Sequence, residues 1–169
     1  MNPLQATFTL GCQVLAGKAM TMKVHVLKVR GQDNLDEMEQ GIAAGHTVDG
    51  WQMPKTAVPG DLAVWYAASP DQDYRAWGWV VGLPRAGFRE SSRLYVGPVG
   101  GIQRIEPVKP RREIAEACGF NRDSVAQQAQ TVPDEIADDF LRALGLPRRF
   151  VTARELISDV MVRVLSSLR

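Results

Sequence analysis

Two short aromatic segments separated by a polar turn constrain this chain more than any other feature of its sequence. Residues 62–68 and 74–82 are rich in β-branched and aromatic side chains, whereas residues 69–73 are polar and contain a proline. Strand-forming segments joined by such a turn predict an antiparallel β-hairpin. Trp77 and Trp79 share one face of the second strand, because side chains two residues apart point in the same direction.

Further strands and then helices are predicted around this hairpin. A near-alternating valine pattern predicts a strand over residues 23–29, and apolar spacing predicts a helix over residues 35–44 with Asn34 as its N-cap and Gly45 as its stop. The other patterns predict a loop over 51–59, strands over 93–96 and 102–105 with a turn between them, a helix over 110–118, a helix capped by Thr131 and a last helix that begins at Thr152. This order indicates the α+β class, with a small curled antiparallel-rich sheet or pseudo-barrel, flanking helices and a helical C-terminal part.

Three parts are expected along the chain. Residues 1–22 are interpreted as an N-terminal extension, because the first convincing strand begins only at Lys23. Residues 23–120 form the expected domain, and residues 121–169 form C-terminal helices that pack on it.

The net charge and the cysteines restrict the ligands and the cellular compartment that we expect for this protein. The formal net charge is +1, whereas a dedicated nonspecific duplex binder carries a strong basic excess. Cys12 and Cys118 are far apart and suit a reducing compartment, so we expect a cytoplasmic protein. We expect no membrane partner, because no apolar run is long enough to span a bilayer.

Signatures of catalysis and metal binding are not found in the sequence. It contains neither a phosphate-binding P-loop nor a Gly-x-Ser-x-Gly nucleophile elbow, and its histidines and cysteines have no paired ligand spacing. His25 alternates with valines, which favours a hydrogen-bonded structural histidine. We therefore expect a binding module without catalytic residues, metal or cofactor.

The tryptophans form the main candidate site, since all four fall between residues 51 and 79. Small residues beside large flat ones leave a concavity that suits a planar base, which gains about 1–3 kcal/mol from stacking. The predicted base pocket consists of Trp51, Trp65, Trp77 and Trp79, with Ser69 and Asp61 as contacts to the base edge. The alternative is that these indoles fill the core, and Asp61 has a second interpretation as a strand-start residue.

Arginines supply a second candidate site. Arg75, Arg104, Arg111 and Arg112 are predicted phosphate contacts, because the guanidinium group matches phosphate geometry. Acidic residues are interspersed among them, and the alternative is an ordinary mixed surface.

The strand motifs resemble those of a known family. Residues 60–66, Gly-Asp-Leu-Ala-Val-Trp-Tyr, are similar to the strand of EVE domains that begins with Gly-Asp and ends in an aromatic pair. Residues 77–82 resemble the following strand, and Trp51 matches a tryptophan after the first helix. EVE domains belong to the PUA-like superfamily and are related to YTH and ASCH domains. The resemblance covers residues 23–120.

This resemblance implies a PUA-like fold that recognises a modified base, in DNA or RNA, within an aromatic pocket. It also implies a reader for a restriction, defence or RNA-modification system, with a separate effector protein as partner. The alternative function is that of a non-catalytic interaction subunit. In that case the last helix, which carries an apolar stripe from Leu156 to Leu168, docks on a partner or on a second copy of the chain.

Overall fold

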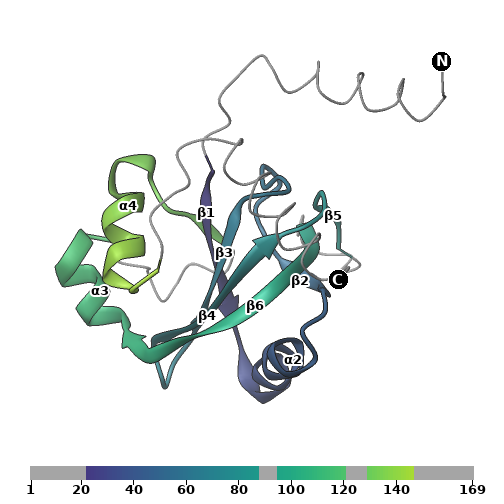
Figure 1. Cartoon of the computed structure of the whole chain (residues 1–169), viewed down its shortest axis with the longest axis horizontal. Coiled ribbons are helices and arrows are strands. Elements are labelled where there is room, and N and C mark those ends of the chain that lie inside the picture. Colours follow the sequence, from purple (N-terminus) through teal and green to yellow (C-terminus); the bar gives the residue numbers. More distant parts are fainter. Residues whose placement is uncertain (1–21, 88–94, 121–128, 147–169) are drawn as a thin grey trace, which may run out of the picture. The chain divides into compact units, whose positions relative to one another are not determined.

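A seven-stranded sheet organises the part of the chain that this computed structural model describes, residues 22–87, 95–120 and 129–146. The strand order is β2-β6-β4-β3-β1-β7, and β5 pairs with β6 (Figure 1). The strands are β1 (Val24–Val29), β2 (Val48–Gln52), β3 (Leu62–Ala67), β4 (Asp73–Val80), β5 (Arg85–Ala86), β6 (Tyr95–Pro110) and β7 (Gln130–Thr131). The predicted extension and the last helix lie outside the described residues, apart from Met22.

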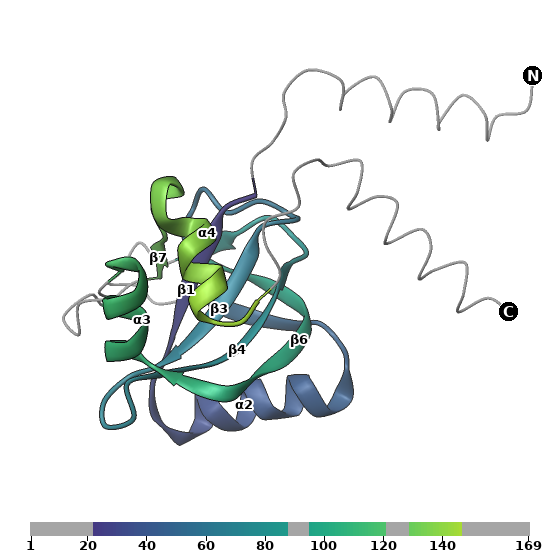
Figure 2. The same cartoon turned by 60° about the vertical axis from the view of Figure 1, so that its left-hand side comes forward.

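The fold is α+β, as predicted, with a mixed sheet that curls strongly into a half-barrel (Figure 2). All strand pairs are antiparallel except β1 and β3, which run parallel in a register that places Val24 beside Leu62. The predicted hairpin is confirmed as β3 and β4, with Leu62 opposite Trp79. Its register shifts between Trp65 and Tyr66, which marks a β-bulge.

Two strand predictions were wrong, and tertiary pairing explains both. Residues 51–52 belong to β2 rather than to a loop, because β2 pairs with β6 and buries Trp51. The described part of the first predicted strand, residues 95–96, and the whole of the second belong to one strand, β6, of 16 residues, whereas residues 93–94 lie outside the described part of the chain. Pairing with β2, β4 and β5 along its length overrides the turn propensity of residues 97–101, and register shifts against β4 absorb the irregularity.

Three helices are described, and all three begin at other residues than predicted, although α3 begins only one residue later. α2 (Gly31–Ala44) starts from an N-cap at Arg30 rather than Asn34, whose Oδ1 instead accepts a hydrogen bond from the Arg30 backbone N–H at 3.2 Å. α4 (Asp134–Ala143) has Pro133 at its N-cap, because the predicted cap Thr131 lies in β7. α3 (Arg111–Cys118) ends as predicted, at a glycine in the left-handed conformation.

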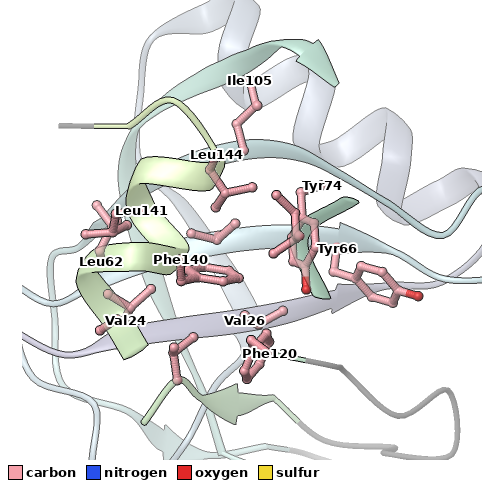
Figure 3. Close-up of a cluster of buried hydrophobic side chains, with 14 residues drawn as sticks. Val24, Val26, Leu62, Tyr66, Tyr74, Ile105, Phe120, Phe140, Leu141 and Leu144 are labelled. Atoms are coloured by element: carbon pink, nitrogen blue, oxygen red, sulfur yellow. The ribbon is translucent and has the colours of Figure 1, made fainter. Parts of the chain in front are cut away.

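Apolar side chains form two clusters, one on each face of the sheet. The cluster on the α4 face combines Val24, Val26, Leu62 and Tyr66 with residues from α3 and α4 such as Phe140 (Figure 3). The cluster on the α2 face comprises Leu27, Val29, Met38, Trp51, Met53, Ala57, Ala63, Trp65, Ala76, Val80, Val99 and Ile102. Alternate strand residues therefore feed opposite clusters, and α2 lies away from α3 and α4 in both views (Figure 1, Figure 2).

Candidate functional site

The four tryptophans do not line one pocket. Trp51 and Trp65 pack edge-on within the α2-face cluster, with ring centroids 5.3 Å apart, and they are 4% and 0% exposed. Trp77 and Trp79 pack edge-on at 6.0 Å and lie half-buried against the α4-face cluster. The register explains the separation: Trp65 lies opposite Ala76, so Trp77 points to the other face of the sheet. Trp51 and Trp65 therefore fill the core, which was the alternative interpretation of these residues.

Asp61 is buried rather than placed at the edge of a base pocket. Its Oδ1 accepts a hydrogen bond from the Lys23 backbone N–H at 2.9 Å, and its Oδ2 accepts one from the Val58 N–H at 3.0 Å. The same Oδ2 lies 2.9 Å from His25 Nε2, and His25 Nδ1 lies 3.0 Å from the Thr131 hydroxyl. Burial alone raises the pKa of Asp61, but the hydrogen bonds from His25, Lys23 and Val58 outweigh it and lower the pKa.

This buried carboxylate and imidazole connect three segments of the chain. His25 lies in β1, Asp61 immediately precedes β3, and Thr131 lies in β7. An ionised carboxylate only accepts hydrogen bonds, so His25 Nε2 donates to Asp61; in the neutral ring, Nδ1 then accepts from Thr131. Because the His25 side chain is 1% exposed, the arrangement holds the fold together and presents no nucleophile to a substrate.

Most of the arginines predicted as phosphate contacts form ion pairs within the chain. Arg75 bonds Asp73 at 2.6 Å and Asp71 at 2.8 Å, and these carboxylates outweigh partial burial to raise its pKa. Arg104 pairs with Glu39, and Arg112 pairs with Glu116 at 2.8 Å. Arg111 begins α3, where its backbone N–H donates to the Gln72 carbonyl at 2.8 Å. The four arginines come from β4, β6 and α3, and their pairing favours the mixed-surface alternative.

A cavity of about 210 Å³ lies where β1 and β3 end and α2 begins. It is lined by Lys28, Arg30, Gly31, Tyr66, Ala68 and Ser69. Ser69 is the predicted site residue that lies here. The lining thus includes two cationic residues and two residues that carry a hydroxyl group, residue types that occur in sites for anionic ligands.

The parallel pairing of β1 and β3 creates this cavity. The two strands end at the same edge of the sheet, and their register places Lys28 directly beside Tyr66. The Ala68 N–H extends the pairing by donating to the Val29 carbonyl at 3.1 Å. Beyond this point the segments that follow β1 and β3 separate. In open sheets with parallel strands, ligands usually bind in the crevice outside the carboxyl ends of those strands.

Glycine and alanine at the cavity leave space that larger residues would fill. Gly31 has a φ of 71°, a left-handed conformation that disfavours other residues, and a Cβ built on it would meet no atom within 4 Å. Tyr66 is buried at the margin of the α4-face cluster, with its hydroxyl directed away from Phe140 (Figure 3). Arg30 and Ser69 are exposed, and Lys28 is half-buried, so solvent reaches the polar end of the cavity.

Sequence reasoning missed five of the six lining residues, among them the polar residues Lys28, Arg30 and Tyr66. The missing signal was the parallel pairing of two strands, which their separate patterns do not reveal. Within residues 22–87, 95–120 and 129–146 there is no group of three or more His, Cys, Asp or Glu side chains that could hold a metal ion. None of the helices in these segments is long and apolar enough to cross a membrane.

Comparison with known proteins supports the fold. No protein-family model matches the chain, and no curated protein matches its sequence. Among solved structures, the chain is similar to the crystal structure of protein Atu2648 from Agrobacterium tumefaciens, with a TM-score of 0.55 and 12% identity over 76% of this chain and 98% of that one. It is also similar to the solution structure of Rpa0253 from Rhodopseudomonas palustris, with a TM-score of 0.50 and 11% identity over 73% of this chain and 94% of that one. At these identities the likeness concerns the fold alone.

Proposed function

We propose that this chain is a cytoplasmic nucleic-acid-binding module that holds one nucleotide of a DNA or RNA strand at the cavity between β1, β3 and α2. The observation that carries the proposal is the lining of that cavity, in which Lys28 and Arg30 accompany the hydroxyl groups of Tyr66 and Ser69. Cationic side chains position phosphates, and hydroxyl groups bond either phosphate or base edges.

We further propose that the module has a PUA-like fold of the EVE type and that the nucleotide it recognises carries a modified base. The resemblance of residues 60–66 and 77–82 to EVE strands supports it. In the folded chain, the aromatic and hydroxyl-bearing residues that line the cavity are Tyr66 and Ser69. Trp77 and Trp79, half-buried on the α4 face, are the tryptophans with exposed surface on which a base could stack.

A binding titration tests the proposal. Fluorescently labelled single-stranded oligonucleotides, with unmodified, methylated or hydroxymethylated bases, are titrated with the intact protein while anisotropy is recorded. The double variant Lys28→Glu/Arg30→Glu is expected to abolish binding through like-charge repulsion of the phosphates. The matched control is Arg112→Glu, which reverses an exposed arginine on α3 that is not part of the cavity lining.

The salt dependence gives an independent readout. Two phosphate contacts predict a slope of log K against log salt of about −1.4 for a single strand, far shallower than the slope of a broad basic face. Absence of binding to every oligonucleotide, by a protein with normal circular dichroism, contradicts the nucleic-acid function. Equal binding of modified and unmodified strands contradicts only the recognition of a modified base.

A further inference from the structure

The buried imidazole of His25 lies between two groups with different hydrogen-bonding capacities. Its Nε2 lies 2.9 Å from the Asp61 carboxylate, and its Nδ1 lies 3.0 Å from the Thr131 hydroxyl. We propose that His25 is a binding site for one proton, and that the Thr131 hydroxyl reverses its hydrogen bond when the ring gains that proton. β7 then stays attached to β1 in both charge states of the ring. The proton site is independent of the proposed nucleic-acid function.

The neutral ring uses both of its nitrogens. An ionised carboxylate only accepts hydrogen bonds, so the hydrogen of the neutral ring is on Nε2 and is donated to Asp61. Nδ1 then carries a lone pair, and the Thr131 hydroxyl donates to it. In this state the hydroxyl hydrogen points toward the ring.

The protonated ring keeps the same two partners. Both nitrogens of an imidazolium donate, and a hydroxyl group accepts as well as donates. Thr131 Oγ1 can therefore accept from Nδ1 without moving, once its own hydrogen has turned away from the ring. Thr131 is half-buried whereas His25 is fully buried, so water can accept the hydrogen that turns away. The side chain of Thr131 thus suits either charge state.

Proton uptake leaves no net charge buried at this position. Asp61 beside a neutral His25 is a single buried negative charge, and the added proton converts the two side chains into an ion pair. A buried charge is costly unless it is paired and hydrogen-bonded. Burial raises the pKa of Asp61, but hydrogen bonds from His25, Lys23 and Val58 outweigh it, so the carboxylate stays ionised as the partner of the ring.

The charges around β1 leave Asp61 as the ionic partner of His25 within the described part of the chain. Lys23, two residues before His25, directs its ammonium to Asp134 at the start of α4. On β3 the residue beside His25 is Ala63, and the two residues of β7 carry no charge. The proton site therefore consists of one imidazole, one carboxylate and one hydroxyl group.

A histidine titration by NMR tests the site in the full chain. The ring nitrogen signals are followed from about pH 9 down to the onset of acid unfolding. Exposed His46 serves as the internal reference, and His46→Gln assigns the two rings. We expect Nε2 of His25 to carry a hydrogen throughout and Nδ1 to gain one in acid. The Val132 amide, which donates to the Val24 carbonyl at 2.8 Å, should stay protected from hydrogen exchange in both states.

Substitutions at Thr131 test the reversal of the hydrogen bond. Thr131→Val removes the acceptor of the charged ring, so His25 should bind its proton about tenfold more weakly, since a hydrogen bond from a charged donor is stronger than a neutral one by about this factor. Thr131→Ser keeps the hydroxyl group and should preserve the proton affinity of the wild type. If Thr131→Val does not fold, Thr131→Ala takes its place.

Four results would overturn the proposal. His25 could stay neutral until the protein unfolds, or its neutral ring could carry the hydrogen on Nδ1. Folded Thr131→Val and Thr131→Ser proteins could bind the proton equally well, which would exclude the hydroxyl as the acceptor. Loss of Val132 protection on proton uptake by an otherwise folded protein would show that β7 detaches. The wild-type titration decides the first two results without any variant.

Discussion

Replacement of Asp61 by alanine is expected to destabilise this protein strongly, because one buried carboxylate holds three separate donors. The Asp61 carboxylate accepts hydrogen bonds from His25 Nε2 at 2.9 Å, from the Lys23 N–H at 2.9 Å and from the Val58 N–H at 3.0 Å. Asp61→Ala removes the acceptor for all three donors at once. Because Asp61 and His25 are both buried, water has little access to replace it.

The structure sets the size of the effect. A hydrogen bond to a charged group contributes about 1.5–3 kcal/mol, and each buried donor that loses its acceptor costs about 1–3 kcal/mol. We therefore expect Asp61→Ala to lower the free energy of unfolding at pH 7 by about 3–5 kcal/mol. That is a large fraction of the roughly 5–15 kcal/mol that stabilises a typical domain. The matched control is Asp139→Ala, which removes an exposed pair with Arg142 and should cost less than about 1 kcal/mol.

Urea unfolding followed by tryptophan fluorescence measures both variants, because Trp65 is fully buried in the folded state. The free energy of unfolding measured at acid pH provides a second test. The pKa of Asp61 is lower in the folded protein than in the unfolded chain, so its contribution is complete above the unfolded value of about 4 and is lost as the pH falls through the folded value. Asp61→Asn should therefore lose less stability than the wild type between pH 5 and pH 2. An Asp61→Ala protein within about 1 kcal/mol of the wild type at pH 7 would refute this reasoning.

Two further substitutions test the packing that supports the sheet. Phe140→Ala should lower the free energy of unfolding by about 3–5 kcal/mol in the same urea assay. The Phe140 ring is fully buried and packs edge-on against the rings of Tyr74 and Phe120, with centroids 5.5 Å and 5.1 Å away. A loss below about 1 kcal/mol would contradict its place in the core. Thr131→Val should cost about 1–3 kcal/mol by leaving His25 Nδ1 without its partner, whereas Thr131→Ser, which keeps the hydroxyl, should cost clearly less; equal losses would contradict the hydrogen-bond explanation.

Local patterns predicted those elements whose stability arises from nearby residues. The hairpin of β3 and β4 follows from two alternating segments and a polar turn, and Gly45 and Gly119 end their helices in the left-handed conformation. β6 escaped prediction as one strand because its glycine-rich centre has the composition of a turn, and only its pairing with β2 and β4 keeps that centre extended. Threonine is a common helix N-cap residue, yet the hydroxyl group of Thr131 forms a hydrogen bond with His25 of the neighbouring strand.

The candidate site depended on information that no single segment carries. Residues 51, 65, 77 and 79 are close in sequence, which suggested a shared pocket, but the face that each occupies depends on strand register. Trp65 pairs with Ala76 and Val64 pairs with Trp77, and this register assigns Trp65 and Trp77 to opposite faces. A shift of register by one residue reverses every side chain of a strand, so proximity in sequence is weak evidence for a common pocket in a sheet protein.

Parallel pairing explains why the cavity lies where it does. In an antiparallel pair, the end of one strand lies beside the beginning of the other. The segments that follow the two strands therefore leave at opposite edges of the sheet. Because β1 and β3 run parallel, Lys28 and Arg30 leave β1 at the same edge where Ala68 and Ser69 leave β3. The α2 crossover begins at that edge and brings Gly31 to the lining. The same connection that makes this sheet mixed therefore assembles the cations and hydroxyl groups from two distant segments into one site.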